Sequence, residues 1–366
     1  MNKARFPYGV SNFETLITDG YIYVDRTKHI ETLERLSARY QFFLRPRRFG
    51  KSLFLSVLEY YYAQEHRNKF ERLFGGLYIG QHPTPLAGKY LVLKFDFSGI
   101  ETEDITKVYR GFLSAIQKGI LSTLYKYPQT FPDDLYSAIE SAESPVEAMS
   151  RLLTFVQTHA SEKLFILIDE YDHFTNELIA FHFDNFQEIV SRNGFVRKFY
   201  EVLKEGTQRG VIDRMFITGV SPITLDSLTS GFNIGSNLSL DLELHDLMGF
   251  REEEVAHLLH HAGVLEEELP QVVGDVRTWY NGYRFHRQAP HRLYNPDMVL
   301  YFAEEYARYR RYPERLLDIN VSSDYGKIGR MLRVGDEKAN WQLLEQLLED
   351  GCAQAAPTVQ FSFERS

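Results

Sequence analysis

The sequence predicts an α/β fold in which a parallel sheet is flanked by helices. Short apolar runs alternate along the chain with longer segments in which apolar residues recur at helical spacing. The apolar runs are continuous, as expected for parallel strands that are buried on both faces. Several of them end in polar residues, and the carboxyl ends of parallel strands share the sheet edge at which ligands bind.

Predicted strands and helices follow one another in turn up to about residue 248. Strands are expected at residues 40–44, 89–97, 164–168 and 213–218, with a fifth around 238–244. Helices are expected over residues 53–62, 103–125, 146–159 and 194–205. Asp96, in the second strand, is expected near the edge of the site.

Beyond about residue 249 the pattern becomes helical. A helix is predicted from Phe250, because acidic residues in its first turn favour the helix dipole. Asn281-Gly282 predicts a tight type I′ turn. Asn295 before Pro296 predicts a helix N-cap followed by proline at the first helical position. We therefore expect a mainly helical C-terminal part, a lid or a winged-helix-like subdomain.

The most informative segment runs from Arg45 to Ser52, Arg-Pro-Arg-Arg-Phe-Gly-Lys-Ser. It ends as the phosphate-binding P-loop G-x-x-x-x-G-K-[ST] does, and it lies between a predicted strand and a predicted helix, as that motif requires. Gly50 would let the backbone approach a phosphate. Lys51 would reach the β- and γ-phosphates, and the Ser52 hydroxyl would bind Mg²⁺.

Arg45 stands where the motif has its first glycine. Pro46 biases Arg45 toward an extended conformation, which makes the exit from the strand less sharp. The arginines add positive charge for a triphosphate, although they would alternatively brace the loop against Asp172 and its neighbours. The alternative for this segment alone is a basic turn with a chance Gly-Lys-Ser. The candidate nucleotide-binding residues are Arg45, Pro46, Arg47, Arg48, Phe49, Gly50, Lys51 and Ser52.

A second motif follows the predicted strand at residues 164–168, where Asp169 and Glu170 come directly after the apolar run. Asp169 would hold Mg²⁺, directly or through water, and Glu170 would polarise the attacking water as general base. A carboxylate pair at a buried strand end also favours a neighbouring cation. The alternative is a strand that runs into an acidic surface loop, which Asp172 continues.

The strand predicted at residues 213–218 contributes a third element. Thr218 and Ser221 lie where a P-loop ATPase places a polar sensor near the γ-phosphate. Each hydroxyl could instead cap a turn. Because the loop, the acidic strand end and this strand occur in the appropriate order, the sequence predicts a P-loop NTPase of the ASCE type.

Composition and charge limit the other classes of function. The chain is large enough to bury a core, and its net charge of −9 argues against broad, non-specific binding of nucleic acid. The single cysteine, Cys352, excludes an intrachain disulfide and suits a reducing compartment. Since neither a signal-peptide pattern nor a long apolar run is present, we expect a cytoplasmic protein without membrane contact.

Nearly the whole chain resembles the prokaryotic AAA-ATPase-like family, in which an arginine at the position of Arg45 is usual. The resemblance rests on YGVSNF (8–13), YVDRT (23–27), FLRPRRFGKS (43–52), IDEY (168–171), ITGVS (217–221), LMGF (247–250), YNGYRF (280–285) and LYNP (293–296). It implies a Mg²⁺-dependent ATPase, a hydrolase of nucleoside triphosphates. The residues that match are Lys51 and Ser52 of Walker A, Asp169 and Glu170 of Walker B, and Thr218 or Ser221 of the sensor.

The same resemblance implies the domain organisation. An ATPase domain is expected over residues 1–248, with residues 1–39 near the adenine, and a helical lid over residues 249–366, in which Arg284 is a candidate to face the γ-phosphate. Family members usually carry a PD-(D/E)xK nuclease-like domain after this module. Its constellation is not found before Ser366, so we expect either a truncated chain or a member without that domain.

Three functions follow from these expectations. The first is ATP binding and hydrolysis. The second is a nucleotide-dependent switch or interaction module with little turnover, because the loop is similar to that of archaeal ATPases of the STAND type. The third is the regulatory half of a DNA-processing nuclease, where nucleic acid would be a partner only through the nuclease-like domain. A protein client or self-association is the remaining partner expected.

Overall fold

A five-stranded parallel sheet forms the centre of the molecule in the computed structural model, which describes residues 4–191, 193–222, 232–317, 332, 336–350 and 352–353. The strand order is β2-β3-β4-β1-β5. This confirms the predicted α/β fold with a parallel sheet. The strands are β1 (Tyr40–Leu44), β2 (Tyr90–Asp96), β3 (Lys163–Asp169), β4 (Ile212–Gly219) and β5 (Ser236–Asn237).

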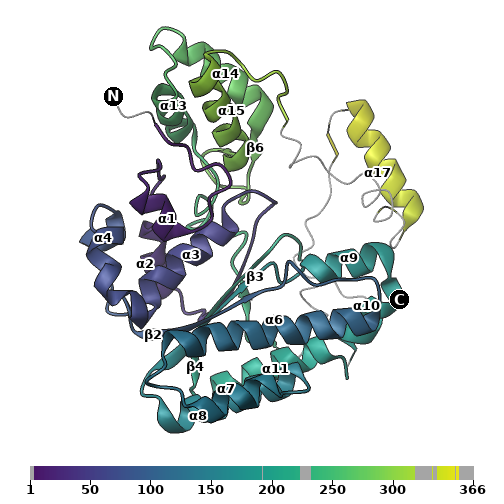
Figure 1. Ribbon diagram of the computed structural model, residues 1–366. Coiled ribbons are helices and arrows are strands. Elements are labelled where there is room, and N and C mark those ends of the chain that lie inside the picture. The colour runs from purple at the N-terminus through teal and green to yellow at the C-terminus, as the bar shows by residue number, and fades with distance from the viewer. Residues whose placement is uncertain are drawn as a thin grey trace.

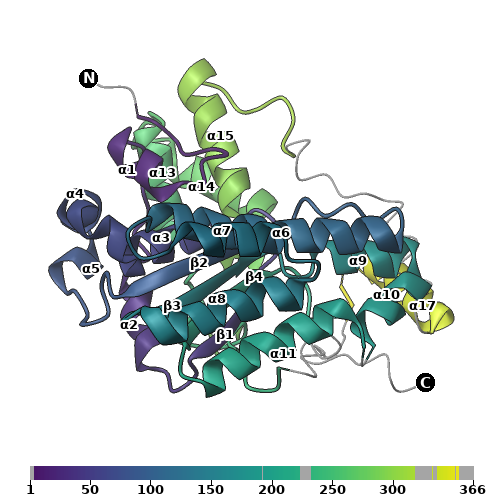
Figure 2. The same ribbon diagram turned by 60° about the horizontal axis from the view of Figure 1, so that its bottom comes forward.

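Helices cover both faces of the sheet, because alternate residues of each buried strand point to opposite sides. In β2, Leu91 and Leu93 pack into one core, whereas Tyr90 and Val92 pack into the other. Figure 2 shows α6, α8 and α11 over the first face. The helices that pack on this face are α6 (Ile105–Lys126), α7 (Asp133–Glu140), α8 (Pro145–His159), α9 (His173–Phe181), α10 (Phe183–Val190) and α11 (Phe195–Gln208).

The second face carries the helix that follows the P-loop segment. The elements that pack there are α1 (Phe13–Thr18), α2 (Lys28–Arg35), α3 (Lys51–Tyr62), α4 (Phe70–Phe74) and α5 (Tyr78–Gln81), and η1 (Gln64–Lys69) joins α3 to α4. The expected strands and helices up to residue 219 therefore occur within a few residues of their predicted bounds. The start of α3, at Lys51, lies two residues before its predicted start, and α11 ends at Gln208, three residues beyond its predicted end.

The fifth strand was predicted in the wrong place. It comprises only Ser236–Asn237, which pairs with β1, and the residues that follow form turns. The Asn237 side chain accepts hydrogen bonds from the backbone N–H and the hydroxyl of Ser239 at 3.0 and 2.5 Å. Such side chain to backbone bonds compete with strand pairing, so the strand ends before the apolar residues around 240.

A third core lies in the C-terminal part, whose helices lie above α1 in Figure 1. It is built by α13 (Glu252–His261), α14 (Leu269–Tyr280) and α15 (Pro296–Tyr309), and Phe6 of the N-terminal segment packs into it. The helix predicted from Phe250 is α13. Asn295 caps α15 by accepting from the N–H of Asp297 at 3.0 Å, as predicted. A further helix, α17 (Glu337–Asp350), follows later in the chain.

The predicted type I′ turn at Asn281-Gly282 is wrong. These residues belong to β6 (Asn281–Tyr283), which pairs antiparallel with β7 (Leu293–Tyr294). Asn281 has an extended backbone, and the register shifts between Asn281 and Tyr283, so Gly282, at φ 150°, occupies an irregularity of the ladder. Glycine is favoured at such a bulge for the same conformational freedom that favours it in a turn.

Candidate nucleotide site

The P-loop segment leads from β1 to α3. Gly50 is the N-cap of α3 at φ 88°, a left-handed conformation that glycine adopts without strain. Arg48 also has a positive φ, 68°, which is uncommon for a residue other than glycine. Because Gly50 has no side chain to cap the helix, the first N–H groups of α3 are left for another acceptor. A helix N-terminus of this kind favours an anion.

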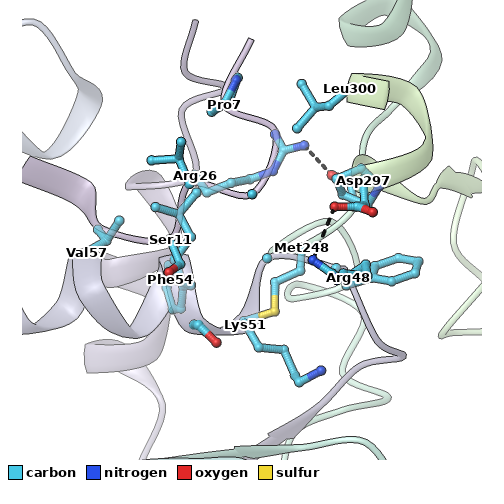
Figure 3. Close-up of a pocket in the computed structure, with 18 of the residues that line it drawn as sticks. Pro7, Ser11, Arg26, Arg48, Lys51, Phe54, Val57, Met248, Asp297 and Leu300 are labelled. Atoms are coloured by element: carbon cyan, nitrogen blue, oxygen red, sulfur yellow. Dashed lines mark hydrogen bonds and ion pairs between the residues drawn. The ribbon is translucent and has the colours of Figure 1, made fainter. Parts of the chain in front are cut away.

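A cavity of about 640 Å³ opens at this loop. Figure 3 shows Lys51 toward one end of the cavity and Pro7 and Leu300 toward the other. The polar lining beside the loop includes Lys51, Ser52, Asp96, Asp169, Glu170 and His173. The apolar lining includes Pro7, Val10, Ile22, Val24, Met248, Leu258 and Leu300. One cavity therefore offers a charged surface for phosphates and an apolar surface for a flat base.

Lys51 and Glu170 meet at the polar end. The Lys51 ammonium lies 3.7 Å from Glu170 Oε1 and donates to the carbonyl oxygens of Arg45 and Pro46, each at 3.2 Å. The lysine side chain is only 4% exposed, so its charge is held inside the cavity wall. Burial leaves it a strong electrostatic partner for any anion that enters.

Asp169 and Thr218 join neighbouring strand ends. Asp169 Oδ1 accepts from the Thr218 hydroxyl at 2.7 Å and from the Glu170 N–H at 3.0 Å. Thr218 is fully buried and does not line the cavity, so its hydroxyl orients Asp169. Asp96 is paired with Asp169 in the register of β2 and β3, and it lines the cavity as expected.

Glu170 follows Asp169 at φ 52°, which is uncommon for a residue other than glycine. Burial raises the pKa of its carboxyl above the ordinary value, and the charges of Asp169 and Asp172 raise it further, whereas Lys51 and His173 oppose them. Strained backbone and a raised carboxyl pKa are both typical of a functional acid or base.

The donor set fits a hard cation. Ser52, Asp96 and Asp169 offer oxygen atoms at the polar end of the cavity. Within the residues that the structure describes, no group of three His, Cys, Asp or Glu side chains could hold a metal. Mg²⁺ is usually held by one or two protein oxygens, with phosphate oxygens and water completing its shell.

Arg45 has a different environment from the other loop residues. It is 1% exposed, and its guanidinium donates to the carbonyl oxygens of Leu44 and Ser239 at 2.9 and 2.7 Å. It also stacks between Phe43 and Phe285, with the guanidinium carbon 4.1 and 3.8 Å from the ring centroids. Burial lowers its pKa to about 9, so it stays charged at pH 7. The Arg45 side chain does not line the cavity. Its contacts with Ser239 and Phe285 instead hold the start of the loop in place.

The bracing does not involve Asp172. The Asp172 carboxylate is fully buried and accepts from the N–H groups of Val220 and Ser221, the latter at 2.6 Å, and from Asn176 at 2.7 Å. Ser221 lies outside the cavity lining, and its carbonyl oxygen accepts from the Tyr171 hydroxyl at 2.6 Å. These contacts fix the acidic loop to the end of β4.

The C-terminal helices hold the loop from the other side. Arg48 Nη1 lies 3.8 Å from Asp297 Oδ1 at the start of α15, and the two side chains face each other in Figure 3. Asn295 donates to the Arg47 carbonyl oxygen at 3.4 Å. Phe49 is buried, with its ring centroid 4.7 Å from that of Tyr283. Arg47 is exposed and lines the cavity, whereas Pro46 contributes its carbonyl oxygen to Lys51.

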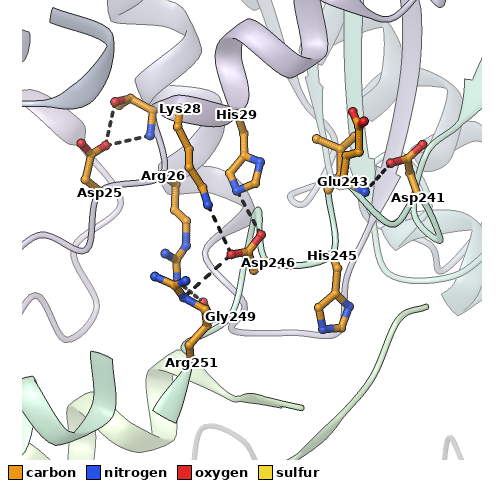
Figure 4. Close-up of polar contacts among 12 residues, drawn as sticks. Asp25, Arg26, Lys28, His29, Asp241, Glu243, His245, Asp246, Gly249 and Arg251 are labelled. Atoms are coloured by element: carbon orange, nitrogen blue, oxygen red, sulfur yellow. Dashed lines mark hydrogen bonds and ion pairs between the residues drawn. The ribbon is translucent and has the colours of Figure 1, made fainter. Parts of the chain in front are cut away.

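An ionic network ties the N-terminal segment to the same region. Arg26 is buried and donates to both carboxylate oxygens of Glu254, at 2.5 and 2.6 Å, and to the Gly249 carbonyl oxygen at 2.6 Å. Figure 4 shows Asp246 beside basic residues, with His29 Nε2 at 3.3 Å and the Lys28 ammonium nitrogen at 3.5 Å. The wall that carries Tyr23 and Arg26 is thereby fixed to the start of α13.

Several lining residues were not predicted from the sequence. His173 lies three residues after Glu170, but it begins α9 while Glu170 has a left-handed backbone before the helix, so helical spacing does not explain why the two meet. Asp297 and Arg26 carry no local signal, because their partners are distant in sequence. Arg284 was a candidate to face a phosphate, but it is exposed and lies outside the cavity lining.

Comparison with known proteins shows a family and a relative to which this chain is similar. A family model described as "Predicted AAA-ATPase" matches residues 7–229. A curated protein of Azotobacter chroococcum mcd 1, "Uncharacterized protein in vnfD 5'region", is 30% identical over 313 residues, 82% of this chain. The chain spans about half of that relative, 52% of its length. Among the described helices, none has both the length and the apolar character to cross a membrane.

Proposed function

The chain belongs to the Predicted AAA-ATPase family, and from this membership and the geometry of the cavity we propose that it binds and hydrolyses ATP with Mg²⁺. The observation that carries the proposal is the meeting of Lys51 and Glu170 at 3.7 Å beside the buried Asp169. These residues come from different strand ends, and they combine a phosphate-binding cation with a candidate general base.

In the proposed reaction, Lys51 turns from Glu170 toward the β- and γ-phosphates, and the N–H groups at the start of α3 receive phosphate oxygens. Glu170 takes the proton of the attacking water, for which its raised pKa is favourable. Ser52 and Asp169 would hold Mg²⁺, which neutralises charge on the phosphates when it is bound. Thr218 keeps Asp169 in place.

The adenine of ATP would lie against the N-terminal segment, where Val10, Ile22 and Val24 form an apolar wall. We assign the ASCE type because β4 lies between β1, which precedes the P-loop, and β3, which precedes Glu170. We also propose that residues from 249 onward act as a helical lid, since α13 and α15 contribute Leu258 and Leu300 to the cavity.

The test compares ATP binding and turnover in two variants. Lys51→Ala should weaken ATP binding by about 100-fold, which corresponds to about 2.8 kcal/mol. Glu170→Gln should retain binding and lose about 100- to 10,000-fold in turnover, as expected for a general base. Lys163→Ala and Glu162→Gln, at the opposite end of β3, serve as controls. Turnover by Glu170→Gln at the wild-type rate would refute the assigned base.

A nucleotide-dependent switch with little turnover is the second candidate. It is favoured by the Arg48–Asp297 pair, because a triphosphate at the loop would compete with Asp297 for Arg48 and so act on α15. Stoichiometric retention of ATP without phosphate release in the wild type would favour the switch. Steady phosphate release that is lost in Glu170→Gln would favour the enzyme.

A further inference from the structure

His173 lines the polar end of the cavity beside Glu170, the proposed general base. It is the first residue of α9, three positions after Glu170, and its side chain is 26% exposed. Its backbone N–H donates to the Glu170 carbonyl oxygen at 3.1 Å. The left-handed backbone of Glu170 is part of this turn, so the two residues are fixed relative to each other.

The imidazole of His173 lies between two carboxylates. Nδ1 is 3.9 Å from Glu170 Oε2, and Nε2 is 3.7 Å from Glu177 Oε1. Glu177 is held in turn, because its Oε2 accepts from the Thr102 hydroxyl at 3.1 Å. A carboxylate beside the far nitrogen of a histidine fixes the orientation of the ring, and with it the direction in which the near nitrogen points.

The two oxygens of Glu170 have different partners. Oε1 faces Lys51 and Oε2 faces His173. When Lys51 turns to a triphosphate, the first of these pairs is lost. Among the ion pairs of the described residues, that with His173 then remains for Glu170, while Asp169 and Asp172 repel its carboxylate.

We infer that His173 is a positioning residue for Glu170, held by Glu177 and Thr102, and that it keeps the carboxylate directed at the attacking water after Lys51 has moved. The inference rests on the proposed function, because it requires Glu170 to act on a water in the presence of ATP. It adds a residue of α9 to a site otherwise built from strand ends and the P-loop. Distances near 4 Å agree with it, since catalytic contacts are often long before substrate binds and tighten in the reacting complex.

The experiment measures single-turnover hydrolysis of ATP and, separately, ATP binding in the whole chain. His173→Ala should lower the hydrolysis rate about 10- to 100-fold, as removal of an orienting partner does elsewhere, and leave the ATP dissociation constant within about twofold of the wild type. His173→Gln, which retains an N–H donor, should recover most of the rate, whereas His173→Phe should not. His159→Ala, on an exposed helix end remote from the cavity, is the control.

A double-mutant cycle separates positioning from a structural effect. In a Glu170→Gln background, His173→Ala should cause no further loss, because the carboxylate that it directs is absent. An equal loss in both backgrounds, or a wild-type rate for His173→Ala, would overturn the inference. If Glu170→Gln hydrolyses ATP normally, the proposed base fails instead, and the two failures are thus distinguishable.

Discussion

Substitution of Arg45 by glycine restores the first residue of the standard P-loop motif, yet it should destabilise this protein. The guanidinium donates to Leu44 O and Ser239 O at 2.9 and 2.7 Å, and more weakly to Leu244 O and His245 O at 3.2 and 3.3 Å. Hydrogen bonds from a charged donor contribute about 1.5–3 kcal/mol each. The two short bonds therefore account for about 3–6 kcal/mol.

Dehydration, ring stacking and backbone entropy also change the contribution of Arg45 to the free energy of unfolding. Dehydration of the guanidinium offsets part of the gain, whereas its stacking on Phe43 and Phe285 adds about 2 kcal/mol or more at a desolvated site. A glycine in place of Arg45 also costs about 0.5–1 kcal/mol in backbone entropy. We expect Arg45→Gly to lower the free energy of unfolding by about 3–5 kcal/mol.

Urea unfolding followed by circular dichroism measures this loss, and Arg47→Gly is the matched control in the same loop. Arg47 is exposed and lines the cavity, so its substitution should cost about 1 kcal/mol or less while it weakens ATP binding. The reasoning would be refuted if Arg45→Gly lost less than about 1 kcal/mol and still abolished ATP binding. That outcome would make Arg45 a nucleotide contact.

Two further predictions concern the network behind the cavity. Arg26→Ala removes the bidentate partner of the largely buried Glu254, which keeps its pair with Arg251, and should cost up to about 3–5 kcal/mol in urea unfolding. Arg277→Ala, which breaks an exposed pair, should cost much less, and equal losses would argue against the burial effect. Burial lowers the pKa of His29 below 6.5, although Asp246 opposes it, so the folded state disfavours the proton. Stability should therefore fall as the pH drops through 6.5, by at most about 1.4 kcal/mol per pH unit, and His29→Gln should remove this slope; an unchanged slope would assign it to another group.

The local elements could be predicted because their signals lie within a few residues. The strand at Tyr40–Leu44 has the predicted bounds, and Asn295 caps α15 through a hydrogen bond to Asp297, two residues away. It is harder to predict from sequence whether a short polar side chain, such as that of Asn237, will compete with backbone pairing and end a strand. The apolar pattern after Asn237 predicted a strand, and the turn that Asn237 forms displaced it.

By itself the sequence determined the parallel sheet and the order of its motifs, from Gly50-Lys51-Ser52 to Asp169-Glu170, because buried strands and a P-loop have local patterns. Only the tertiary structure decided which arginines face the cavity. Arg45 is bound by carbonyl oxygens such as Ser239 O, 194 positions away, and Arg26 by Glu254, 228 positions away. Every residue has a backbone carbonyl, so the sequence does not indicate which carbonyl an arginine will bind. That depends on how the chain packs.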